Sequence, residues 1–165
     1  MSPADIQIAV IGGATCSERH RDLAFRTGAE IGRAGATLLC GGRGGVMQAV
    51  AEGARSVGGS TLGVLPGVDR NDTPPNPFIQ TTIFTGLGQA RNQILVLSAN
   101  AVIAIGGGWG TLTEIGLALK HRRPVLLLDS WILELPDECR DSPLFRTDSP
   151  EDAVHQALTF RNPKG

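Results

Sequence analysis

An apolar run leads directly into a glycine-rich turn in AVIAIGGGWGTLTE, residues 101–114. Residues 101–105 are all apolar, which is typical of a parallel strand covered on both faces of its sheet, and residues 111–122 have a helical pattern. Glycine backbone at a helix N-terminus leaves unpaired N–H groups and the positive end of the helix dipole open to an anion. The stretch therefore predicts a strand, a phosphate-binding turn and a helix.

The same unit recurs along the chain. Residues 6–11, 37–40, 61–65 and 124–128, together with the alternating segment 79–84, predict strands. Residues 17–35, 46–57, 89–99 and 149–160 predict helices, the last one closing the domain. Alternation of this kind favours a doubly wound α/β sheet, mostly parallel, with helices on both faces. We expect a single Rossmann-like domain over residues 1–165.

Three further glycine turns follow predicted strands, at Gly12-Gly13, at Gly41 to Gly45 and at Gly86 to Gly88. Because right-handed crossovers bring the loops that follow parallel strands to one edge of the sheet, we expect the glycine turns to converge on one pocket. Neither the turn at Gly41 nor the one at Gly106 has the Lys-Ser/Thr of a Walker loop or the context of a dinucleotide fingerprint. Ordinary ATP or NAD enzymes are therefore disfavoured.

Polar side chains next to the turns are the candidate ligand-binding groups. The Thr111 hydroxyl, Arg43 and Arg91 are expected to assist the backbone in holding a phosphate. Glu114 has two interpretations: a capping-box partner of Thr111, or a ribose ligand or general acid/base opposite Arg91. Trp109, expected in the loop, either stacks on a flat heterocycle or packs in the core.

Composition and charge exclude several classes of partner. The net charge is -1, aromatic residues make up 4%, and Lys and Arg form no dense block, so neither a nucleic-acid polymer nor a membrane is an expected partner. The sequence has neither a membrane-span-length apolar stretch nor a signal-peptide pattern, so a cytoplasmic location is expected. Helices 46–57 and 89–99, rich in small and apolar residues, favour a homo-oligomer, either a dimer or a tetramer.

No metal site is predicted, because the cysteines lack paired spacing. Cys16 is interpreted as a reduced bystander or, alternatively, as a nucleophile or metal ligand near the pocket. The histidines are interpreted as solvated side chains; they are His20, His121 and His155. The proline-rich loop at 69–77 is long enough to act as a lid over the pocket.

Taken in order, the turn at Gly41 to Met47, Arg91, and the segment Gly106 to Glu114 resemble the LONELY GUY and lysine-decarboxylase-like superfamily. That resemblance covers most of the chain and implies a modified Rossmann fold. Its best-known enzymes cleave cytokinin riboside 5'-monophosphates, and their catalytic arginine and glutamate correspond to Arg91 and Glu114. The implied phosphate-binding residues are Gly107, Gly108, Gly110 and Thr111, with Gly42, Gly44 and Gly45 matching the earlier glycine turn.

Two departures and the short length bring the chain nearer to one branch of that superfamily. Where those enzymes carry Pro-Gly-Gly and Arg-Lys, this chain has Ile105-Gly106-Gly107-Gly108 and Arg91-Asn92. The short branch includes molybdenum-cofactor carrier proteins, which bind the phosphorylated pterin (molybdopterin) without transforming it.

Three functions follow as alternatives. In the first, the protein carries molybdenum cofactor, and the loop at 66–78 shields this oxygen-labile ligand. The second is a nucleoside-monophosphate N-glycosidase of the LONELY GUY type, and the third is a nucleotide-sensing module. All three require a small phosphorylated heterocycle as the ligand.

Overall fold

The computed structural model describes residue 2 and residues 5–160. Within them, seven strands form one sheet in the order β4-β3-β2-β1-β5-β6-β7, and each neighbouring pair runs parallel. The strands are β1 (Gln7–Gly12), β2 (Thr37–Cys40), β3 (Ser60–Leu65), β4 (Thr81–Phe84), β5 (Ala101–Gly106), β6 (Val125–Ser130) and β7 (Leu144–Thr147). The prediction of a doubly wound parallel sheet is confirmed.

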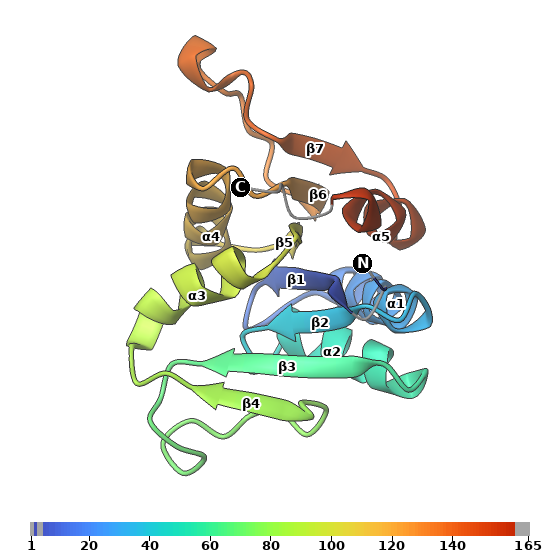
Figure 1. Cartoon of the computed structure of the whole chain (residues 1–165), viewed down its shortest axis with the longest axis vertical. Helices are drawn as coiled ribbons and strands as arrows, with labels where there is room; N and C mark the ends of the chain where they lie inside the picture. The colour runs from blue at the N-terminus through green and yellow to red at the C-terminus, as the bar shows by residue number, and fades with distance from the viewer. Residues whose placement is uncertain (1, 3–4, 161–165) are drawn as a thin grey trace.

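Helices cover both faces of this sheet (Figure 1). On one face lie α1 (Glu18–Arg33), α2 (Val46–Ser56) and α5 (Pro150–Thr159); on the other lie α3 (Arg91–Ser98) and α4 (Trp109–Lys120). Two short 3-10 turns, η2 (Gly88–Ala90) and η3 (Asp137–Cys139), complete the described elements. Each face has its own apolar cluster, one with α1, α2 and α5 and one with α3 and α4.

Strands β5 and β6 are buried where they are apolar. All six residues of β5 are buried, as are the first four of β6. The chain adds β2, β3 and β4 outward from β1, then crosses back to place β5 on the other side of β1. This reversal creates a topological switch point between β1 and β5, where open α/β sheets bind their ligands.

Two glycines allow α1 and α2 to touch through their backbones. A Cβ at Gly28 would overlap the Val50 carbonyl, and one at Gly53 would overlap the Phe25 carbonyl. The apolar face of α2 is thus covered within the chain, which corrects the expectation that this helix is available for association. On α3, Ile94 remains 37% exposed.

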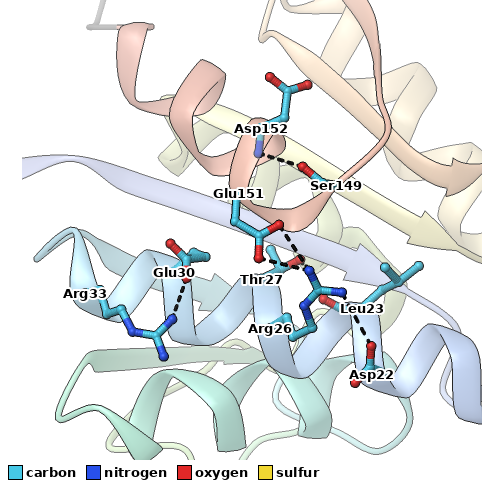
Figure 2. Close-up of polar contacts among 9 residues, drawn as sticks. All are labelled: Asp22, Leu23, Arg26, Thr27, Glu30, Arg33, Ser149, Glu151 and Asp152. Atoms are coloured by element: carbon cyan, nitrogen blue, oxygen red, sulfur yellow. Dashed lines mark hydrogen bonds and ion pairs between the residues drawn. The ribbon is translucent and has the colours of Figure 1, made fainter.

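An ion pair joins α5 to α1 (Figure 2). The Arg26 guanidinium donates to both carboxylate oxygens of Glu151, over 2.9 and 3.2 Å. Both helices begin as the sequence predicts: the Ser17 and Ser149 hydroxyls accept from His20 N and Asp152 N, respectively. These contacts fix the N-terminal turn of α1, which faces the switch point.

One strand was not predicted, and two helices begin at other residues than predicted. β7 was missed because it is an edge strand in which Phe145 and Arg146 are exposed, so it has no apolar run, and its pairing with β6 defines it. The helix predicted at 89–99 begins as the 3-10 turn η2 and becomes α-helical at Arg91. The helix predicted at 111–122 begins two residues earlier, at Trp109.

In the described part of the chain, no helix has the length and apolar character needed to cross a membrane.

Candidate functional site

A cavity of about 1100 Å³ lies at the carboxyl ends of β1 and β5, at the switch point. All four glycine turns contribute to its wall, as expected from the parallel topology. Its lining includes Gly12, Gly13, Gly41, Arg43, Gly88, Arg91, Gly107, Gly108, Gly110, Thr111 and Glu114. It is large enough for a heterocycle and its phosphate rather than for a phosphate alone.

The turn after β5 is shaped by backbone that only glycine adopts readily. Gly106 and Gly107 have φ angles of 53° and 99°. A Cβ at Gly107 would collide with the Thr111 side chain, whereas Gly108 and Gly110 have no protein atom within 4 Å of an added Cβ. At Gly108 and Gly110 the wall of the cavity therefore consists of backbone without side chains.

The N-terminus of α4 leaves its first amide groups available. Gly108 is the N-cap, with no side-chain capping bond, and Leu112 N is the donor to the Gly108 carbonyl. The N–H groups of residues 109–111 precede that first bond and have no partner inside the helix. Thr111 is the third helical residue rather than the cap, so the capping-box interpretation of Glu114 is wrong.

Glu114 and Arg91 are both buried in the cavity wall. Glu114 is 8% exposed, and burial raises the pKa of its carboxyl from 4.5 to about 7, although the charge of Arg91 acts in the opposite direction. Burial lowers the pKa of the Arg91 guanidinium, which the charge of Glu114 opposes. Among the described residues, the two form no direct ion pair, so each retains hydrogen-bonding capacity for a ligand.

Arg91 is oriented by backbone rather than by a carboxylate. Its Nη1 donates to the Val64 carbonyl over 2.7 Å. A Cβ at Gly41 would overlap the guanidinium, so the second glycine turn makes the space in which Arg91 lies. The Nε atom of Arg91 is buried and without a hydrogen bond in the described structure. The guanidinium is thus held at the cavity with part of its donor capacity unused.

Most of the second glycine turn serves packing. Gly41 and Arg43 line the cavity, but Gly42, Gly44 and Gly45, expected to bind ligand, are not among its lining residues. Gly42 and Gly45 have φ angles of 73° and 61°, and a Cβ at Gly45 would overlap the Gly13 carbonyl. Gly45 therefore lets the turn close against the β1–α1 loop, whereas Gly42 lies against the Leu65 side chain of β3.

The proline-rich loop is tied to this same turn. Asn76 N donates to the Gly42 carbonyl over 2.8 Å, and Asn76 Nδ2 donates to the Arg43 carbonyl over 2.9 Å. Of the segment 66–78, the lining of the cavity includes Pro66. The expected lid is therefore anchored beside the second glycine turn rather than lying free over the pocket.

Trp109 does not lie where the sequence predicts. It is the first residue of α4 rather than a loop residue, it is 78% exposed, and it is not in the cavity lining. Its ring packs on Trp131, with ring centroids 5.5 Å apart. Neither interpretation, stacking on a ligand inside the pocket or packing in the core, describes this exposed pair.

Two groups in the lining were not singled out from the sequence as ligand contacts. His20, interpreted as solvated, lines the cavity, and so does Asn92, whose Oδ1 is buried without a partner. In the sequence, His20 follows the Ser17 helix cap shortly after the first glycine turn, and this position could have indicated that it lies at the pocket. Cys16 also lines the cavity, whereas Cys40 is buried, which raises the pKa of its thiol to about 11. In the described residues, no group of three or more His, Cys, Asp or Glu side chains is arranged to hold a metal ion.

Residues 5–161 match the model of the SLOG cluster4 family. This chain belongs to that family. The SLOG chain is 41% identical to an uncharacterised protein of Archaeoglobus fulgidus over 140 residues, which are 81% of this chain and 91% of that protein. It is 34% identical to the cytokinin riboside 5'-monophosphate phosphoribohydrolase of Mycobacterium tuberculosis over 117 residues, 67% of this chain and 63% of that enzyme. The match thus spans less than two thirds of the mycobacterial enzyme.

Two solved structures match the SLOG chain over nearly its whole length. The molybdenum cofactor binding protein of Rippkaea orientalis has a TM-score of 0.82 and 35% identity, covering 93% of this chain and 94% of that one. The molybdenum cofactor carrier protein of Chlamydomonas reinhardtii has a TM-score of 0.77 and 34% identity, covering 93% and 98%. The predicted superfamily, with its carrier branch, is confirmed.

Proposed function

We propose that this SLOG protein is a carrier of molybdenum cofactor, which it binds in the cavity at the switch point without transforming it. The observation that carries the proposal is the likeness to the two molybdenum cofactor proteins, which extends over 93% of this chain at 34–35% identity. The match to the mycobacterial phosphoribohydrolase covers only 63% of that enzyme. Full-length correspondence favours the carrier over the enzyme.

The residues present fit a phosphorylated pterin. We assign the phosphate to the bare backbone at Gly107, Gly108 and Gly110 and to Thr111, because unpaired N–H groups at a helix N-terminus bind anions. Arg43 and Arg91 supply positive charge at the same cavity. The volume of about 1100 Å³ leaves room for the pterin beyond the phosphate.

The carrier proposal is tested by retention of the cofactor. Molybdenum cofactor released anaerobically from a molybdoenzyme is mixed with the protein, passed over a desalting column and measured by the fluorescence of its oxidised derivative. We expect the cofactor to elute with the protein and to oxidise more slowly than free cofactor. Elution of all cofactor in the small-molecule fraction would overturn the proposal.

A second candidate is N-glycosidase activity on a nucleoside 5'-monophosphate, and the buried Arg91 and Glu114 favour it. A carboxyl with a pKa of about 7 is suited to general acid/base catalysis near neutral pH. A buried guanidinium beside it can stabilise negative charge on the leaving base. These two side chains correspond to the catalytic pair of the superfamily's enzymes.

Turnover separates the two candidates. Purified protein is incubated with AMP and with N6-substituted AMP, and free base is measured by chromatography. Release of base that disappears in Glu114→Gln would establish the enzyme. Retention of cofactor by both the unmodified protein and Glu114→Gln, with no base released by either, would establish the carrier.

A further inference from the structure

His20 lies against the glycine turn that follows β5. It is the third residue of α1, and a Cβ at Gly106 would overlap its imidazole ring. The ring also lines the cavity, with 26% of its side chain exposed. An imidazole is therefore packed on the residue that immediately precedes the bare backbone of Gly107 and Gly108.

The carboxylate of Asp129 fixes which ring nitrogen faces the protein. His20 Nε2 lies 3.2 Å from Asp129 Oδ2, and Arg19 Nε donates to that same oxygen over 2.7 Å. The hydrogen bond from Arg19 lowers the pKa of Asp129, so this carboxylate is ionised and can only accept. Nε2 of His20 must then be the protonated nitrogen that donates to it.

Asp129 and the next residue hold both the imidazole and the turn. Asp129 has a φ of 49°, an uncommon conformation for a residue other than glycine. Ser130 Oγ donates to the Gly106 carbonyl over 2.7 Å, and the pairing of β5 with β6 shifts register at this point. The end of β6 therefore sets the position of His20 relative to Gly106.

The second ring nitrogen, Nδ1, has no hydrogen-bond partner within the described residues. It is also absent from the buried, unpartnered side-chain atoms of the described chain, so this nitrogen is accessible to solvent and to a ligand. Here one nitrogen is committed to a carboxylate and the ring lies in a ligand-sized cavity. The arrangement resembles the way a carboxylate orients a histidine so that its other nitrogen meets a ligand.

We propose that His20 is a ligand-binding residue whose imidazolium donates from Nδ1 to a phosphate group held at the Gly107–Thr111 turn. The inference rests on the proposed binding of a phosphorylated ligand. The Asp129 carboxylate accepts from Nε2 and fixes the ring, and the phosphate would accept from Nδ1 on the other side of the ring. The other charged groups at this site are Arg19 beside Asp129, and Arg43, Arg91 and Glu114 in the cavity lining.

Calorimetry with AMP and adenosine tests the contact, since only AMP carries the phosphate. In His20→Gln we expect the Kd for AMP to rise at least about tenfold, because a charge-assisted hydrogen bond is lost, and the Kd for adenosine to change less than about twofold. His121→Gln is the matched control, since His121 is exposed at the other end of α4. An unchanged Kd for AMP in His20→Gln, or equal losses for AMP and adenosine, would overturn the inference.

A measurement on the unmodified protein needs no variant to fold. With ¹⁵N-labelled histidine at pH 7, inorganic phosphate is expected to move the Nδ1 resonance of His20 toward the imidazolium value, while His121 and His155 stay unchanged. Absence of that shift while AMP still binds would reject the role of His20 but leave the carrier proposal standing. Failure of the unmodified protein to bind either AMP or phosphate would instead reject the phosphate site on which both proposals depend.

Discussion

Replacing Glu114 by Gln is expected to stabilise the protein at alkaline pH and to have little effect at pH 5. Glu114 is buried, and burial raises the pKa of its carboxyl from 4.5 to about 7. Between these two values the folded protein binds a proton that the unfolded chain releases. The contribution of protonated Glu114 to the free energy of unfolding is therefore fully present below about pH 4.5 and is lost as the pH rises through 7.

The magnitude follows from the size of the increase in pKa. At about 1.4 kcal/mol for each tenfold change in the proton equilibrium, the full cost of ionising buried Glu114 is about 3 kcal/mol. About 2–3 kcal/mol of this cost appears between pH 5 and pH 8.5. The amide of Gln resembles the protonated acid in shape and charge, so the variant avoids the cost.

The assay is urea unfolding of both proteins at pH 5 and pH 8.5, followed by circular dichroism. The free energy of unfolding of Glu114→Gln minus that of the unmodified protein is expected to increase by about 2–3 kcal/mol between the two pH values. Glu151→Gln is the control: the pKa of exposed Glu151 is lowered, so it is already ionised over this range and its difference should stay constant. A change below about 0.5 kcal/mol for Glu114→Gln would refute the assignment of a buried acid with a raised pKa.

Three other substitutions test the cavity wall, the anchored loop and the association surface. Gly108→Ala is expected to raise the Kd for AMP at least about tenfold in calorimetry, because the added methyl would occupy space at the cavity that the phosphate needs. Gly116→Ala on α4 is the control: its methyl also meets no protein atom, but Gly116 does not line the cavity, so the Kd should not change. Equal effects of the two variants would contradict the phosphate site. Asn76→Ala is expected to lower the free energy of unfolding by about 1–3 kcal/mol in urea, because it removes the hydrogen bond from Asn76 Nδ2 to the Arg43 carbonyl and the one that Asn76 Oδ1 accepts from Phe78 N. An unchanged midpoint would mean that this side chain does not hold the loop there. Ile94 on α3 is 37% exposed. If the chain forms a homo-oligomer through α3, Ile94→Lys should dissociate it and move the protein to a later elution volume on a sizing column. An oligomer that persists in this variant would exclude α3 from the interface.

Local patterns in the sequence were sufficient to predict the five α-helices and six of the seven strands in the described chain, in their order. Strands β5 and β6 are continuous apolar runs, and the helices that follow the strands have capping residues such as Ser17 and Ser149. β7 was missed because edge strands have no such run. The pattern also assigned Trp109 to a loop, although it is the first residue of α4, because the three glycines before it do not indicate where the helix begins.

Chemistry at the site depends on burial and on distances that no local pattern contains. The sequence by itself determined that glycine turns follow parallel strands and therefore meet at one edge, because right-handed crossovers bring the loops after parallel strands to the same edge of the sheet. Only the tertiary structure decided that Gly44 and Gly45 lie against the β1–α1 loop, that Gly42 lies against Leu65, and that burial raises the pKa of Glu114. It also joined His20 to Asp129, 109 positions apart in the sequence, because β5 and β6 bring the end of one strand beside the first turn of α1.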